Sequence, residues 1–167
     1  MDQIRYRSNS ELKALVKRDE KALKAFIQQL KNKKPADVDD AFHSLHNEAF
    51  QKFDCLKCAN CCSSISPIIT EKDIDKLAKH FKMKPSAFID QYLHIDEDND
   101  YVYNNTPCPF LMPDNYCMVY ENRPKACREY PHTDRRKMQQ ILKLTLQNCE
   151  VCPVVFGIVS EIRKSNL

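Results

Sequence analysis

Four thiols within eight residues constrain this 167-residue chain more than any other feature. They belong to Cys55, Cys58, Cys61 and Cys62, and gaps of two residues separate the first three. Such a gap lets two thiolates converge on one metal ion. One or two cysteines are often buried as small apolar residues, but four so close together favour a metal site. Adjacent Cys61 and Cys62 point in different directions if the backbone is extended, which favours two sites or two corners of one cluster.

Five further cysteines supply the rest of a ligand set: Cys108, Cys117, Cys127, Cys149 and Cys152. Cys108 and Cys117 flank a Pro-Asp-Asn turn at 113–115, which would bring them together. Cys149 and Cys152 repeat the two-residue gap. Eight of the nine cysteines would make two four-thiolate sites, or one iron–sulfur cluster plus a structural zinc, with one left over.

Composition excludes several classes of function. The only glycine, Gly157, cannot form a Walker-type phosphate loop or a dinucleotide-binding turn. The net charge is +3 and no aromatics interleave with the basic residues of 1–34, so we expect no nucleic-acid partner. The first twelve residues hold no apolar run, and one of the two longest uncharged stretches, 101–113, is interrupted by proline. We therefore expect no secretory leader and no membrane span.

We accordingly expect a cytoplasmic protein. Thiols stay reduced in that compartment, so clustered cysteines indicate metal binding or redox chemistry rather than disulfides.

Apolar periodicity predicts a mostly helical fold. The expected helices lie at 10–33 with Ser10 as N-cap, at 35–49, at 70–81 with Thr70 as N-cap, at 85–93, from 134 to about 145, and from 153. Short strands are expected at 101–103 and 116–120. We predict a single metal-stabilised domain, mostly α with a small irregular β-hairpin insertion. An N-terminal helical hairpin at 1–49 would pack on a cysteine-cluster domain at 50–167.

The cysteines and their neighbours resemble the YkgJ-type cysteine cluster family, whose CxxCxxCC domain is described as chelating zinc or iron. The resemblance covers residues 50 to about 160, and a related domain occurs in flagellin lysine methylases. Its matching blocks are the 55–62 run, Cys108-Pro-Phe-Leu, the stretch 117–131, and Cys152-Pro. The resemblance implies metal binding by Cys55, Cys58, Cys61, Cys62, Cys108, Cys117, Cys127 and Cys152. Cys149 has no place in that set, and no established reaction is implied.

The residues leave two metals open. Eight thiolates divide into two closed, tetrahedral four-cysteine zinc sites, which are structural. Alternatively, three close cysteines and a distant one beside proline form the ligand layout of a [4Fe–4S] ferredoxin. Thiolate is a good ligand for both metals. We predict Zn²⁺, as two ions, with iron or a [4Fe–4S] cluster as the alternative.

Two arginines bracket Cys127. Four thiolates on one zinc dication carry a net charge of −2, which needs counter-charge and hydrogen-bond donors when buried. We predict that Arg123 and Arg128 supply them. The alternative is that one of these arginines binds an anionic substrate or partner.

The function predicted from the sequence is metal binding with a mainly structural or metal-handling role, and no protein partner is specified. The alternative is an iron–sulfur or zinc metalloenzyme with redox or methyl-transfer-related activity. A catalytic metal site needs an open coordination position. The sequence offers enough ligands to close two sites and no clear base or nucleophile besides the thiols, which favours the first class.

Overall fold

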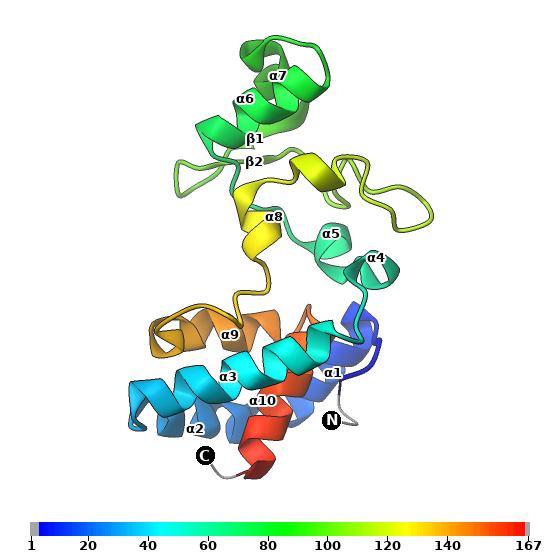
Figure 1. Cartoon of the computed structure of the whole chain (residues 1–167). Helices are drawn as coiled ribbons and strands as arrows, with labels where there is room; N and C mark the ends of the chain where they lie inside the picture. The colour runs from blue at the N-terminus through cyan, green and yellow to red at the C-terminus, as the bar shows by residue number, and fades with distance from the viewer. Residues whose placement is uncertain (1–3, 166–167) are drawn as a thin grey trace. The chain divides into compact units, whose positions relative to one another are not determined.

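Three helices open the part of the chain that the computed structural model describes, residues 4–165 (Figure 1). They are α1 (Asn9–Arg18), α2 (Glu20–Lys31) and α3 (Pro35–Phe50). Ser8, and not the predicted Ser10, caps α1, because its hydroxyl accepts from the Glu11 N–H while the Glu11 carboxylate accepts from the Ser8 N–H.

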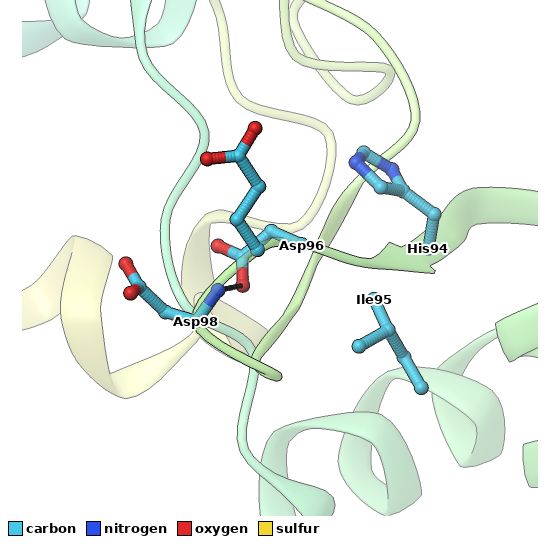
Figure 2. Close-up of a pocket in the computed structure, with 5 residues that line it drawn as sticks. His94, Ile95, Asp96 and Asp98 are labelled. Atoms are coloured by element: carbon cyan, nitrogen blue, oxygen red, sulfur yellow. Dashed lines mark hydrogen bonds between the residues drawn. The ribbon is translucent and has the colours of Figure 1, made fainter.

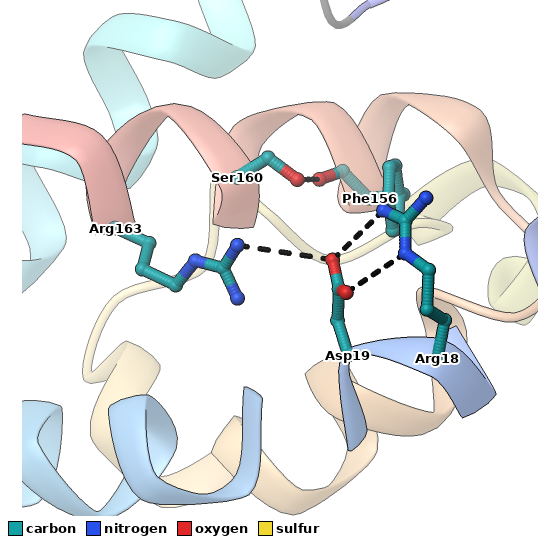
Figure 3. Close-up of polar contacts among 5 residues, drawn as sticks. All are labelled: Arg18, Asp19, Phe156, Ser160 and Arg163. Carbon is teal, nitrogen blue, oxygen red and sulfur yellow. Dashed lines mark hydrogen bonds and ion pairs between the residues drawn. The ribbon is translucent and has the colours of Figure 1, made fainter. Parts of the chain in front are cut away.

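The prediction of a single helix at 10–33 is wrong, because Asp19 separates two helices. Aspartate favours helix ends over helix interiors. Figure 3 shows the Asp19 carboxylate between two guanidinium groups, 2.9 Å from Arg18 Nε and 3.8 Å from Arg163 Nη2. Asp19, at the break between α1 and α2, therefore forms ion pairs with both arginines.

The described residues form two compact units. Unit 1 comprises 4–60 and 131–165, and unit 2 comprises 61–130. Besides the first three helices, unit 1 contains α4 (Cys55–Cys58), the 3₁₀ turn η2 (Met138–Ile141), α9 (Leu142–Asn148) and α10 (Pro153–Ser165). Helix α5 (Asn60–Ser64) begins at the last residue of unit 1.

Helix α10 forms the centre of unit 1. Eight consecutive residues from Pro153 to Ser160 are buried, and the helix packs against α3 and α9. The Arg7 guanidinium lies 5.4 Å from the centre of the Phe156 ring. The Ser160 hydroxyl donates to the Phe156 carbonyl at 2.7 Å (Figure 3). The helix predicted from Pro153 is therefore the core element of this unit.

Helix α3 fixes the segment that leads into α9. His43 Nε2 lies 2.9 Å from the Arg135 carbonyl oxygen, and His46 Nδ1 lies 2.8 Å from the Thr133 hydroxyl. The Asp39 carboxylate accepts from the N–H of Met138. These contacts hold 133–137 outside a helix, so the helix predicted from 134 starts only at 138, as η2.

Unit 2 contains α6 (Glu71–His80), α7 (Pro85–Tyr92), β1 (Leu93–Ile95), β2 (Tyr101–Tyr103), η1 (Tyr120–Asn122) and α8 (Lys125–Glu129). Thr70 caps α6 as predicted. Strands β1 and β2 pair antiparallel, with Leu93 opposite Tyr103. The core of this unit combines aliphatic side chains with an aromatic cluster, in which the rings of Phe81, Phe88 and Phe110 stack on one another.

The predicted fold class, mostly α with a small β-hairpin, is confirmed. Two strand details are wrong. Leu93 begins β1 instead of ending a helix, and 116–120 forms no strand but a single bridge between Cys117 and Leu111. Prolines at 109, 113 and 124 interrupt that region, which limits it to isolated pairing. The turn at 113–115 is present, with the Asn115 N–H donating to the Met112 carbonyl at 2.9 Å.

Candidate metal centres

Four of the predicted ligands are neighbours within unit 2; we call Cys62, Cys108, Cys117 and Cys127 the unit-2 thiols. Burial raises the pKa of Cys127 to about 12, and the charges of the other three add to the rise. Burial likewise raises the pKa of Cys108 to about 11, with Cys62 and Cys117 as contributing neighbours. These mutual effects place the four sulfurs in one electrostatic cluster.

Backbone hydrogen bonds bring three of these cysteines together. The Cys108 N–H donates to the Cys62 carbonyl at 2.7 Å, which joins the CxxCxxCC segment to the Cys108-Pro block. The Met118 N–H donates to the Phe110 carbonyl at 2.9 Å, beside the Leu111–Cys117 bridge. This hairpin sets Cys108 and Cys117 close together, as the turn at 113–115 predicts.

Backbone amides are directed at the sulfurs of the same hairpin. The N–H groups of Phe110 and Leu111 lie at the Cys108 sulfur and counteract the rise in its pKa that burial causes. The Val119 N–H does the same for Cys117. Hydrogen bonds of this kind stabilise thiolate, which is the form that binds metal.

Asp73 positions the helix that carries Cys127, a role that the sequence pattern does not predict. Its side chain is buried, with the residue 4 % exposed. One carboxylate oxygen pairs with Thr70 in the cap of α6, and the other accepts from the Lys125 N–H at 2.9 Å, at the start of α8. The capping motif is visible in the sequence, but the second bond joins residues 52 positions apart.

The two arginines lie in different places. The Arg123 guanidinium stacks 3.6 Å above the Tyr120 ring, and its charge opposes the rise that burial causes in the pKa of Cys117 and Cys127. Arg128 is exposed, and its guanidinium donates to the Arg123 carbonyl oxygen. Arg123 therefore brings positive charge near the thiols, while Arg128 supports the backbone of Arg123.

Cys61 lies beside the unit-2 thiols. Its sulfur is 3.9 Å from that of Cys62, and this contact lowers the pKa of Cys62 to about 7. Because the two residues lie in helix α5, their sulfurs do not diverge as they would in an extended segment.

A second cluster lies in unit 1; we call Cys55, Cys58 and Cys152 the unit-1 thiols. Burial raises the pKa of Cys152 to about 12, and the charges of Cys55 and Cys58 contribute to the rise. The N–H groups of Val154 and Val155, in the first turn of α10, lie at the Cys152 sulfur and act in the opposite direction.

The segment that carries Cys55 and Cys58 is tied to the neighbourhood of Cys152 by Asn60. Its side-chain amide donates to the Val151 carbonyl at 3.1 Å and to the Arg7 carbonyl at 2.7 Å. Tyr6 adds a further tie, since its hydroxyl accepts from the Asp54 N–H at 3.1 Å. Tyr6 and Arg7, which precede α1, therefore help to hold this cluster together. No pattern in the sequence predicts this role.

Cys149 differs from the cysteines of both clusters. It is fully buried, and its thiol donates to the Thr145 carbonyl at 3.4 Å within the α9 turn. Burial raises the pKa of this thiol, with Cys152 as a smaller cause. These contacts are those of a packing residue.

Among residues 4–165, no group of three or more His, Cys, Asp or Glu side chains has the geometry of a formed metal site. The two clusters are neighbouring thiols and not coordination spheres. Their chemistry nevertheless fits a soft metal, because they combine several sulfurs with amide donors and, in unit 2, a guanidinium.

The end of β1 and the acidic turn that follows it, residues 94–98, line a surface hollow (Figure 2). One Asp96 oxygen accepts from the N–H groups of Asp98 and Asp100, each at 3.0 Å. The Asp96 carboxylate therefore stabilises the turn in which it lies.

Residues 54–153 match the sequence profile of the CxxCxxCC family, described as a "putative zinc- or iron-chelating domain". The chain belongs to the CxxCxxCC family. The match includes all nine cysteines and leaves out the first three helices. No curated protein and no solved structure matches the chain. The resemblance to this family is thereby confirmed, whereas the relation to flagellin lysine methylases is not shown.

Within residues 4–165, no single helix is long and apolar enough to cross a membrane, although η2–α9 and α10, bent by 119° at their junction, meet that criterion as a pair.

Proposed function

We propose that this CxxCxxCC protein binds two zinc ions through its two clusters of cysteines, with a mainly structural or metal-handling role. The observation that carries the proposal is the set of backbone contacts that joins the segments of Cys62, Cys108 and Cys117. The electrostatics of Cys127 add support, because the other three cysteines are among its neighbours. Family membership supports the metal, zinc or iron.

The unit-2 thiols have the donor set of a closed zinc site. Tetrahedral zinc binds thiolates at about 2.3 Å, so metal binding would draw the half-buried side chains closer together. Binding requires each thiol to release its proton. The amides at Cys108 and Cys117 and the charge of Arg123 would stabilise the resulting negative charge. Bound zinc would supply a cross-link between Cys62, the 108–117 hairpin and α8.

The unit-1 thiols supply three ligands of the second proposed site. Cys61 is the eighth member of the ligand set, and Cys149 is outside it. Loss of bound metal in Cys61→Ser, together with full retention in Cys149→Ser, is the result that this assignment predicts. Full retention in Cys61→Ser would remove Cys61 from the set.

A [4Fe–4S] cluster is the second candidate, because Cys55, Cys58 and Cys61 with Cys152 before Pro153 match the ferredoxin spacing. Anaerobic purification followed by elemental analysis and absorbance spectroscopy distinguishes the two. Zinc with no visible absorbance supports our proposal. Iron and sulfide together with visible absorbance would replace it with the cluster.

The cytoplasmic location, the absence of nucleic-acid and membrane partners, and the division between 1–49 and 50–167 remain predictions.

A further inference from the structure

A buried hydroxyl group in the apolar cluster against which Cys108 and Cys117 pack has no hydrogen-bond partner among the described residues. It belongs to Tyr103, which is only 3 % exposed. The Tyr103 backbone is well satisfied, since its N–H donates to the Ser66 hydroxyl at 2.8 Å. Leaving a buried hydroxyl unpaired costs about 1–3 kcal/mol, so this residue at this position needs a physical reason.

The Tyr103 ring lies in the same part of unit 2 as the cysteines. Tyr103 is the last residue of β2, and its ring meets that of Phe110 edge-on, with centroids 5.5 Å apart. Phe110 is also the residue whose N–H lies at the Cys108 sulfur. Cys108 and Cys117 pack against the apolar cluster that contains Tyr103 and Phe110.

Cys108, Cys127 and Cys117 are electrostatic neighbours of the phenol, because each adds to the rise that burial causes in the pKa of Tyr103. A tyrosine hydroxyl is protonated at neutral pH even without such a rise, so it can donate a hydrogen bond. A neutral thiol is a weak acceptor, whereas a metal-bound thiolate is a strong one.

We propose that the Tyr103 hydroxyl donates a hydrogen bond to a metal-bound thiolate of the unit-2 thiols. This inference rests on the metal site proposed above and makes Tyr103 a positioning residue for it. Without metal, the hydroxyl has no partner among residues 4–165; with metal bound, it gains a charged acceptor. The same group thus destabilises the metal-free state and stabilises the loaded state.

These opposite effects on the metal-free and the metal-loaded protein distinguish our proposal from a purely structural role of Tyr103. Tyr103→Phe removes only the hydroxyl oxygen and keeps the ring against Phe110. Tyr101→Phe is the matched control, since Tyr101 lies two residues earlier on β2 and is half-buried. Three properties are measured on the full-length wild type and both variants: Zn²⁺ affinity by competition with a colorimetric chelator, the sulfur-to-cobalt charge-transfer band after Co²⁺ loading, and the melting temperature of the chelated protein.

We expect Tyr103→Phe to bind Zn²⁺ about 10-fold more weakly, at the lower end of the effect of losing a group that supports a metal ligand. Its charge-transfer band should move to lower energy, because the sulfur loses a hydrogen bond, while its metal-free form should melt at or above the wild-type temperature. Tyr101→Phe should match the wild type in affinity and spectrum. Unchanged affinity and spectrum in Tyr103→Phe would overturn the inference while leaving the metal site intact. A wild type that binds neither Zn²⁺ nor Co²⁺ would overturn the proposed function and this inference together.

Discussion

Units 1 and 2 obtain their order from different sources. Unit 1 is built on α10, whose buried residues contact helices from both ends of the chain. Unit 2 has an aromatic cluster around α6 and α7, but its described segment 104–130 contains no strand and no helix longer than the five residues of α8. The segment with the least regular structure carries three of the unit-2 thiols. The comparison indicates that metal should matter most where apolar packing provides least.

Metal removal is expected to have the largest effect on stability, and this effect should differ between the two units. Structural zinc contributes on the order of 10 kcal/mol to a small site. A strong chelator under reducing conditions should greatly increase hydrogen exchange at 104–130 and leave the amides of α10 protected. Hydrogen-exchange mass spectrometry with and without metal measures this. Uniform loss of protection across both units would remove the distinction between them, and unchanged protection in demonstrably metal-free protein would argue against a structural metal.

Substitution of Arg123 should weaken only the metal of unit 2. Because its guanidinium is near the thiols, Arg123→Ala is expected to reduce Zn²⁺ affinity about 10- to 100-fold. Arg128→Ala is the control and should have a smaller effect, since that exposed side chain acts on the backbone of Arg123 and not on the thiols. Chelator competition measures both. Equal losses would show that the two arginines act as one unit.

Asn60→Ala tests the corresponding support in unit 1. The change removes the donor to the carbonyls of Val151 and Arg7, at a cost of about 1–3 kcal/mol. We expect a lower melting temperature and weaker metal binding at the unit-1 thiols, with the unit-2 metal unaffected. Asn47→Ala, at an exposed position of α3, is the control. A melting temperature equal to that of the control would mean that Asn60 does not hold this cluster.

Lys82→Gly should stabilise unit 2 slightly without touching its metal. Lys82 follows α6 with φ of 55°, and the Met83 N–H donates to the Ala78 carbonyl at 3.0 Å, as in a Schellman cap. Glycine adopts positive φ without steric cost, so a gain of about 0.5–1 kcal/mol is expected. Chemical denaturation measures the gain, and metal content should stay the same. A loss of stability would show that the lysine side chain contributes more than its backbone costs.

Local features of the fold could be predicted from the sequence, and long-range ones could not. The Thr70 cap, the helix after Pro153 and the turn at 113–115 depend on neighbouring residues and are present. The pairing of Leu93 with Tyr103 depends on the partner strand, whereas the apolar pattern through 93 by itself predicts helix.

The candidate site shows the same limit. The spacing identified the cysteines as a set, but which of them cluster depends on hydrogen bonds between distant segments, such as the one from Cys108 to Cys62. The two arginines also looked equivalent in the sequence. Stacking on Tyr120 gives Arg123 an environment that Arg128 lacks.

Native mass spectrometry of zinc-loaded protein tests the central claim most directly. One variant combines Cys108→Ser with Cys127→Ser, and the other combines Cys55→Ser with Cys152→Ser. Our account predicts two zinc ions per wild-type chain, one in each double variant, and two in Cys149→Ser. A wild type that carries no metal, or a double variant that loses both ions or neither, would contradict the assignment of one metal to each cluster.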